Sequence, residues 1–248
     1  MRKFGLIGFP LSHSFSKKFF TGKFQNESIT DCEYDLFPIE DVNSLPELIA
    51  QHEELEGLNV TIPHKLRVLQ FLDEIDEAAA DIGAVNCISI NRTQGKPHLK
   101  GFNTDAYGFE SSLLPMLDVH HTKALVFGNG GAAKAVKYVL NKLNIPYLIV
   151  SRNPDQDGLN YEGVTPELLK DYTVLINTTP LGMSPNADTF PEIPYDALSD
   201  KHLAYDLVYN PEETSFLKKS KNRGAKIKNG IDMLYLQAER SWYIWNTQ

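Results

Sequence analysis

Apolar and polar residues along the chain form a repeating pattern, in which a short apolar run precedes a longer amphipathic stretch. The apolar runs have the length of buried strands and cover residues 3–7, 32–37, 57–60, 83–90, 123–127, 147–150, 174–176, 203–207 and 225–228. The stretches with helical spacing cover residues 16–24, 41–51, 64–72, 76–80, 106–114, 132–143, 165–170, 214–221 and 230–245. This alternation predicts an α/β protein, and its regular continuation after residue 123 predicts a doubly wound sheet.

Composition narrows the class of protein. A chain of 248 residues with 42% hydrophobic and 23% charged residues suits a globular protein of one large or two modest domains. No apolar run approaches the ~18 residues of a membrane span, and the N-terminal apolar segment is too short for a signal peptide, so we expect a cytoplasmic protein without a membrane partner. The net charge of −8 argues against nucleic acid as a partner. Cys32 and Cys87 match no metal or disulfide pattern, so no metal site is expected.

A glycine-rich turn follows the strand at 123–127. Gly128, Gly130 and Ala133 fit the G-x-G-x-x-G/A spacing of dinucleotide sites, with a helix after them and a second strand beyond it. Glycine allows a sharp turn and lets a pyrophosphate approach bare N–H groups at the positive end of the helix. A plain structural turn is the alternative, and the flanking strands and helix favour the dinucleotide.

The residues after the second strand indicate which dinucleotide is bound. NAD sites place a carboxylate there for the ribose 2′-hydroxyl, whereas this chain has Ser151, Arg152 and Asn153. A guanidinium can hold a 2′-phosphate by charge-assisted hydrogen bonds, and a carboxylate would repel it. Asp155 lies past Pro154 and is expected to belong to the loop. The predicted cofactor is therefore NADP.

Polar residues also gather at predicted strand ends in the N-terminal half. Asn59 and Thr61 are two residues apart, so both lie on one face of an extended segment. Lys65 falls in the first turn of the helix predicted at 64–72, where the helix dipole disfavours a cation. A residue that breaks a local rule is a candidate for function, and a solvated surface lysine is the alternative. Asn86 brings a second amide, and with Asn59 it suggests a polar pocket.

Further polar residues stand next to predicted helices. Ser14 and Ser16 either cap the helix at 16–24 or bind an anion. The polar residues at 103–105 can cap the helix at 106–114. Gln237 lies beside the apolar stripe of the last helix, so it can be buried where that helix meets a pocket.

Eight short segments, taken in order, carry a resemblance to a known family. They are Ser14-Phe-Ser16, Asn59-Val-Thr-Ile-Pro-His-Lys65, Gly83-Ala-Val-Asn86, Asn103-Thr-Asp105, Gly128-Asn-Gly-Gly-Ala132, Asn177-Thr-Thr-Pro-Leu-Gly-Met183, Tyr209-Asn-Pro211 and Gly230-Ile-Asp-Met-Leu-Tyr-Leu-Gln237. Each is weak alone, but all of them in this order resemble the shikimate dehydrogenase family nearly end to end.

The resemblance implies two domains with an active-site cleft between them. Residues 1–103 with 230–248 would form an α/β substrate domain, and residues 104–229 a Rossmann-like NADP domain. The implied activity is NADP-dependent reduction of 3-dehydroshikimate to shikimate, on the route to aromatic amino acids, by a monomer or a homodimer. Lys65, as general acid/base, and Asp105 would be catalytic.

The resemblance also implies two sets of binding residues. The substrate-binding set is Ser14, Ser16, Asn59, Thr61, Asn86, Tyr209 and Gln237. The cofactor-binding set is Gly128, Asn129, Gly130, Gly131, Ala132, Ser151, Arg152, Asn153, Thr178, Gly230 and Met233. The chain departs from the family at Lys17, where proline is frequent, at Asn129, where small residues are usual, and in the short stretch 151–161.

Three other functions remain open at this point. A quinate/shikimate dehydrogenase of broader specificity is close, although Arg152 weakens its NAD-linked version. A ligand-sensing regulator on the same fold would be expected to lose Lys65 and Asp105 or to add a nucleic-acid-binding segment. A dehydrogenase acting on a folate or an amino acid is disfavoured by the serine pair and Gln237.

Overall fold

The chain divides into two compact units. The computed structural model describes residues 1–11, 14–92, 95–155 and 157–247. The first unit comprises Met1–Thr104 and Gln237–Gln248, and the second comprises Asp105–Leu236. The structure thus divides the chain after residues 104 and 236, whereas the sequence places the boundaries after residues 103 and 229. No helix in the described ranges combines the length and apolarity needed to cross a membrane.

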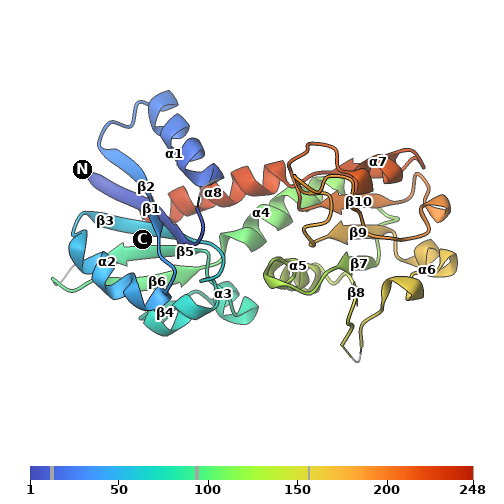
Figure 1. Ribbon diagram of the computed structural model, residues 1–248, viewed down its shortest axis with the longest axis horizontal. Helices are drawn as coiled ribbons and strands as arrows, with labels where there is room; N and C mark the ends of the chain where they lie inside the picture. Colours follow the sequence, from blue (N-terminus) through green and yellow to red (C-terminus); the bar gives the residue numbers. More distant parts are fainter. Residues whose placement is uncertain (12–13, 93–94, 156, 248) are drawn as a thin grey trace. The chain divides into compact units, whose positions relative to one another are not determined.

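The first unit contains a six-stranded sheet in the order β2-β1-β3-β5-β6-β4 (Figure 1). Its strands are β1 (Arg2–Gly8), β2 (Cys32–Pro38), β3 (Leu55–Val60), β4 (Glu74–Ile75), β5 (Cys87–Asn91) and β6 (His98–Phe102). Strand β1 pairs in parallel with β2 and β3, while β5 is antiparallel to both β3 and β6. The sheet is therefore mixed. The sequence pattern did not predict β6, because Lys100 and Gly101 interrupt its apolar run.

Helices cover both faces of this sheet. The elements are α1 (Phe15–Asn26), α2 (Leu45–Gln51), α3 (Glu77–Ile82), the 3₁₀ turns η1 (Val42–Ser44) and η2 (Arg67–Phe71), and the end of α8 (Ile231–Thr247). Side chains alternate along β1, so Phe4 joins a core with α1 and α8 while Ile7 joins a core with α2. The Trp245 indole donates to the Ile88 carbonyl oxygen at 2.9 Å. It lies so close to the sheet that a Cβ on Gly57 would come within 2.3 Å of it.

The predicted helix at 64–72 is wrong. Residues 62–63 and 65–66 form turns, and only Arg67–Phe71 is helical, as a 3₁₀ turn. The Lys65 carbonyl oxygen accepts from the Val85 N–H at 2.8 Å, so a tertiary bond occupies a group that a helix would use internally. The helix-dipole argument for Lys65 therefore does not apply, and its candidacy rests on the family motif.

The predicted strand at 83–90 begins later than expected. Helix α3 continues to Ile82 and ends at Gly83, whose φ of 66° is the left-handed geometry of a helix C-terminus. The strand starts only at Cys87. Asn86 thus precedes the strand, although its backbone N–H still donates to the Phe102 carbonyl oxygen at 3.0 Å.

The second unit is a doubly wound sheet, as predicted. Its five parallel strands have the order β11-β10-β9-β7-β8. They are β7 (Ala124–Phe127), β8 (Tyr147–Val150), β9 (Val174–Asn177), β10 (Leu203–Asp206) and β11 (Lys226–Lys228). The other elements are α4 (Thr104–Leu113), η3 (Leu114–Met116), α5 (Gly131–Lys142), η4 (Tyr161–Gly163), α6 (Pro166–Asp171), η5 (Tyr195–Ala197) and α7 (Ser215–Lys221). Strand order reverses between β7 and β9, and ligands of such sheets bind at the carboxyl ends of the strands there.

Candidate functional site

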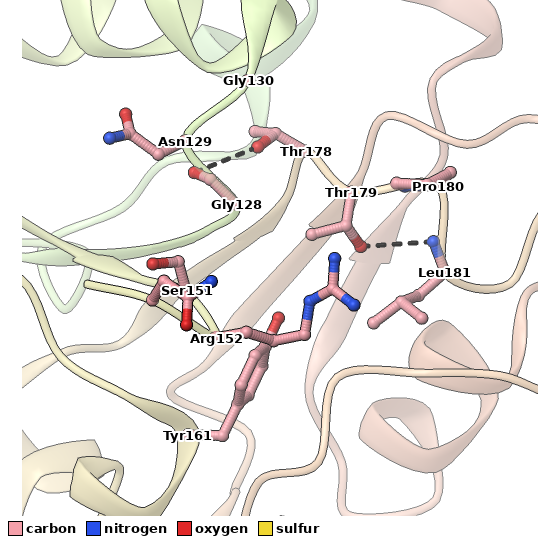
Figure 2. A pocket seen from close by; sticks show the side chains of 11 residues that line it. Gly128, Asn129, Gly130, Ser151, Arg152, Tyr161, Thr178, Thr179, Pro180 and Leu181 are labelled. Atoms are coloured by element: carbon pink, nitrogen blue, oxygen red, sulfur yellow. Dashed lines mark hydrogen bonds between the residues drawn. The ribbon is translucent and has the colours of Figure 1, made fainter.

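A pocket of about 680 Å³ lies at this reversal point in the second unit. Its lining comes from the residues that follow β7, β8 and β9, and from η4 (Figure 2): Gly128, Asn129, Gly130, Ser151, Arg152, Asn153, Tyr161, Thr178, Thr179, Pro180 and Leu181. The volume is within the range of small-molecule and cofactor sites. Predicted cofactor residues from all three strand ends therefore meet in one pocket, and Gly131 and Ala132 follow directly in the first turn of α5.

The glycine-rich turn fits a close-lying phosphate group. Gly128 has a φ of 98°, and a Cβ there would come within 2.9 Å of the Thr178 hydroxyl oxygen, so this glycine is required by the turn itself. A Cβ on Gly130 or Gly131 would meet nothing within 4 Å, so packing does not require those two glycines. They leave space in front of the amino end of α5, where N–H groups and the helix dipole favour an anion.

Arg152 is the cationic group of the pocket. Figure 2 shows its side chain extending past Tyr161 toward Thr179 and Leu181. Burial raises the pKa of Tyr161, and the positive charge of Arg152 opposes that rise. The described residues after β8 place no carboxylate in the pocket lining. The pocket can therefore hold a phosphate by charge-assisted hydrogen bonds.

Asn129 connects the glycine turn to the stretch after β8. Its amide nitrogen donates to Asp155 Oδ2 at 2.9 Å, and its amide oxygen accepts from Lys137 Nζ at 3.1 Å. Asp155 is thus bonded to the Asn129 amide and does not belong to the residues that line the pocket. The departure from a small residue at this position has a structural role within the loop.

Several residues that shape the pocket received no role from the sequence, although most of them lie in the family segment 177–183. The buried Asn177 amide oxygen accepts from the Thr179 N–H at 3.1 Å and from the Thr179 hydroxyl at 2.6 Å. The Asn177 amide nitrogen donates to Asp206 Oδ1 at 2.9 Å. These bonds fix the loop that carries Thr179, Pro180 and Leu181. Polar residues directly after the buried strand β9 were the available signal, while Tyr161 had none because only the fold brings it near.

Asp206 is a fully buried carboxylate beneath this loop. It accepts from Asn177, from the Thr214 hydroxyl at 2.6 Å and from the Val208 N–H at 3.0 Å. Burial raises the pKa of Asp206 to about 6, although these hydrogen bonds act to lower it. In the unfolded chain this carboxyl has a pKa of about 3.9, so it loses its proton at a lower pH there than in the folded protein. Stability from this group is therefore fully present below about pH 4 and is lost as the pH rises toward 6.

Asp206→Asn is expected to stabilise the protein near neutral pH by about 2 kcal/mol, because the amide keeps the shape without the buried charge. The gain should shrink to near zero at about pH 3, where the wild-type carboxyl is protonated in both states. Thermal unfolding across this pH range measures it, with the exposed Asp157→Asn as the control. Equal stabilities of wild type and Asp206→Asn at every pH would contradict the prediction.

In the first unit, three predicted substrate residues share one buried polar network. The Asn59 amide nitrogen donates to Ser241 Oγ at 2.9 Å, and the Asn86 amide nitrogen donates to Thr104 Oγ1 at 3.0 Å. The Thr104 hydroxyl lies 3.3 Å from Ser241 Oγ and donates to Gln237 Oε1, also at 3.3 Å. Asn59, Asn86 and Gln237 thus meet through two hydroxyl groups that the sequence analysis did not select.

Two other predicted residues of the first unit, Thr61 and Lys65, follow Asn59 closely in the sequence. The Thr61 N–H donates to the Ile7 carbonyl oxygen at 2.9 Å, which holds the segment after β3 beside β1. His64 is fully buried, with Nε2 2.7 Å from the Ile39 carbonyl oxygen, and it fixes the turn that carries Lys65. The Lys65 backbone bonds to Val85, the neighbour of Asn86.

The two serines differ in their surroundings. Ser14 is the N-cap residue of α1, yet its side chain makes no capping bond. Its hydroxyl oxygen is buried and has no hydrogen-bond partner within residues 1–11, 14–92, 95–155 and 157–247. Burial raises the pKa of Tyr34 well above its ordinary value, and a hydrogen bond with Ser16 acts in the opposite direction. The capping alternative therefore fails for Ser14, and a hydroxyl without a partner at a helix start suits an anionic ligand.

The remaining predicted residues belong to the second unit, outside the described pocket. Asp105 is in the first turn of α4, and Tyr209, after β10, has 39% of its surface exposed. A Cβ on Gly230 would come within 2.1 Å of the Leu207 carbonyl oxygen, so close packing accounts for that glycine. Met233 is half-buried on α8.

The second unit is a doubly wound sheet with a glycine-lined pocket, and the first unit is also α/β. These features define a two-domain protein with a Rossmann-like domain. The model of the shikimate dehydrogenase substrate-binding domain matches residues 6–88. A shikimate dehydrogenase (NADP(+)) from Methanosphaera stadtmanae is 37% identical over 97% of this chain and 89% of its own length. The chain therefore belongs to the shikimate dehydrogenase family, and the predicted fold class and family are confirmed.

Solved structures agree with this assignment. A chorismate mutase/shikimate 5-dehydrogenase fusion protein from Clostridium acetobutylicum is 35% identical, with a TM-score of 0.85 over 99% of this chain and 91% of that one. Shikimate 5-dehydrogenase from Thermus thermophilus, in complex with NADP(H) and shikimate, is 28% identical. Its TM-score is 0.84 over 100% of this chain and 94% of that one.

Proposed function

We propose that this chain is an NADP-dependent shikimate dehydrogenase that reversibly reduces 3-dehydroshikimate to shikimate. The observation that carries the proposal is the pocket at the β7–β9 reversal point, in a chain of this family. The described residues that line it include Arg152 and no carboxylate. The names of its relatives, shikimate dehydrogenase (NADP(+)), support the substrate and the cofactor. The cytoplasm is the proposed location.

We assign the two binding tasks to different parts of the chain. Residues 1–103 with 230–248 form the proposed substrate domain, supported by the family model over residues 6–88 and by the packing of Trp245 against Gly57. Residues 104–229 form the proposed NADP domain. A monomer or a homodimer is compatible with this assignment.

In the proposed NADP site, the turn at 128–132 holds the pyrophosphate at the start of α5. Arg152 binds the 2′-phosphate, flanked by Ser151 and Asn153, and Thr178 borders the pocket opposite them. Gly230 and Met233 are assigned to the nicotinamide end on the family resemblance alone. The bound cofactor supplies the carbon that donates or accepts the hydride.

In the proposed substrate site, Ser14 and Ser16 bind the carboxylate. Hydrogen-bonding side chains bind the ring hydroxyls, because a triol needs a partner for each buried hydroxyl; the predicted set is Asn59, Thr61, Asn86, Asp105, Tyr209 and Gln237. Lys65 donates a proton to the carbonyl oxygen during reduction and accepts the hydroxyl proton during oxidation. Asp105 acts on the same hydroxyl and orients it.

Deuterium labelling tests this reaction directly. NADPH carrying deuterium at the transferable position of the nicotinamide is mixed with 3-dehydroshikimate, and the product is analysed by mass spectrometry and NMR. We expect shikimate with one deuterium on the newly formed carbinol carbon. Unlabelled shikimate, or no shikimate, would overturn the proposed hydride transfer.

A further inference from the structure

Asn59 has a buried side chain whose hydrogen-bonding groups are already engaged within the protein. The side chain lies in β3 with 5% of the residue exposed. Its amide nitrogen is 2.9 Å from Ser241 Oγ and 3.3 Å from the Asn86 carbonyl oxygen. Its amide oxygen accepts from the Tyr34 hydroxyl at 2.8 Å. An asparagine side chain has two donor hydrogens, and both of them have acceptors here.

The orientation of both amides follows from backbone groups. A carbonyl oxygen can only accept, so the Asn59 atom facing the Asn86 carbonyl must be the nitrogen. A backbone N–H can only donate, so the Asn86 atom 2.6 Å from the Thr104 nitrogen must be the oxygen. The Asn86 amide nitrogen then donates one hydrogen to Thr104 Oγ1. Within the described part of the chain its second hydrogen has no acceptor, so it can bind a ligand.

Ser241 links this arrangement to the last helix. It is fully buried, accepts from Asn59 and donates to the Gln237 carbonyl oxygen at 3.0 Å, one turn earlier on α8. Thr104, 1% exposed, accepts from Asn86 and donates to the Gln237 side chain. Side chains from β2, β3, the residue before β5, α4 and α8 are thereby held in one continuous network.

We infer that Asn59, Tyr34 and Ser241 form a positioning bracket for Asn86 and Gln237, and that Asn59 does not itself contact the substrate, which removes it from the predicted set of hydroxyl ligands. This inference rests on the proposed function, because it deepens the assignment of the substrate site. A displaced Asn86 or Gln237 would leave a buried substrate hydroxyl poorly paired, so damage to the bracket weakens substrate binding. The cofactor pocket belongs to the second unit, and NADP binding stays unchanged.

Tyr34→Phe tests the bracket because it removes the hydroxyl that donates to Asn59 Oδ1 and keeps the ring. It also removes a hydrogen bond with Ser16, which the Ser241→Ala variant leaves in place. We expect the KM for shikimate to rise about fivefold, which is the effect of losing one buried hydrogen bond, with the KM for NADP unchanged. The matched control is Tyr205→Phe, another fully buried tyrosine, whose hydroxyl lies 2.7 Å from Ser112 Oγ in the second unit. Both variants should lose stability, and only Tyr34→Phe should raise the KM for shikimate.

Ser241→Ala gives a second, independent variant. Its matched control is Ser220→Ala, because Ser220 is also fully buried and donates to a carbonyl one turn earlier on its helix, at 2.9 Å. We expect a rise in the KM for shikimate of about fivefold for Ser241→Ala and none for Ser220→Ala. If both bracket variants keep the wild-type KM while wild type is active, the inference is overturned. A wild type without shikimate turnover would instead overturn the proposed function.

A crystal structure with shikimate bound decides the role of Asn59 even if the variants fold poorly. We expect the Asn59 amide to keep its bonds to Ser241 and the Asn86 carbonyl, with no substrate oxygen within hydrogen-bond distance. A shikimate hydroxyl bonded to either Asn59 amide atom would show that Asn59 is a substrate ligand and overturn the inference.

Discussion

Lys65→Met is expected to lower kcat for shikimate oxidation by about a thousandfold, while the KM for shikimate stays within about threefold of wild type. Methionine has a similar length but cannot exchange a proton with the reacting oxygen. The backbone at this position is held by the bond from Val85 and by the buried His64, so the substitution should leave the turn in place. Steady-state rates with NADP and shikimate measure the effect.

The control for this variant is Lys96→Met, which removes an exposed lysine from the same unit. It should retain wild-type kcat. A kcat for Lys65→Met close to that of Lys96→Met would contradict the role of Lys65 as the proton donor.

Arg152→Gln is expected to raise the KM for NADP by about tenfold to a hundredfold and to leave the KM for NAD nearly unchanged. Hydrogen bonds to a charged group contribute about 1.5–3 kcal/mol, and only NADP carries the 2′-phosphate that Arg152 would bind. The KM for NADP of the wild type should also rise with ionic strength, and that of the variant should rise less.

Arg223→Gln serves as the matched control, since Arg223 is a half-exposed arginine of the same unit that pairs with Asp196. Its KM for both cofactors should equal that of the wild type. Equal losses of NADP and NAD affinity in Arg152→Gln would show that the arginine supports the pocket as a whole and does not select the cofactor.

Much of the second unit could be predicted because its strands are buried on both faces. Such strands are continuous apolar runs, as in β7 and β9. A glycine-rich turn between such a strand and a helix is typical of a dinucleotide site. The first unit was harder to predict from the sequence. Strand β6 contains Lys100 and Gly101, and the turn around Lys65 depends on a bond to Val85, which no local pattern reveals.

The candidate site also shows that local sequence patterns do not reveal tertiary contacts. Gly128 and Arg152 could be selected because each follows a strand in the sequence, and the structure places both in one pocket. Tyr34 and Ser241 could not, since their bonds to Asn59 connect residues 25 and 182 positions apart. A buried hydroxyl in a helix or strand looks like ordinary core until the fold supplies its partner.

The measurement that tests the central claim most directly is the rate of NADPH formation by the purified protein with NADP and shikimate, compared with NAD and with quinate. We predict rapid turnover with NADP and shikimate, and a much lower kcat/KM for every other pair. Comparable turnover of quinate would indicate the broader quinate/shikimate enzyme, and NADP binding without turnover of either substrate would contradict the account.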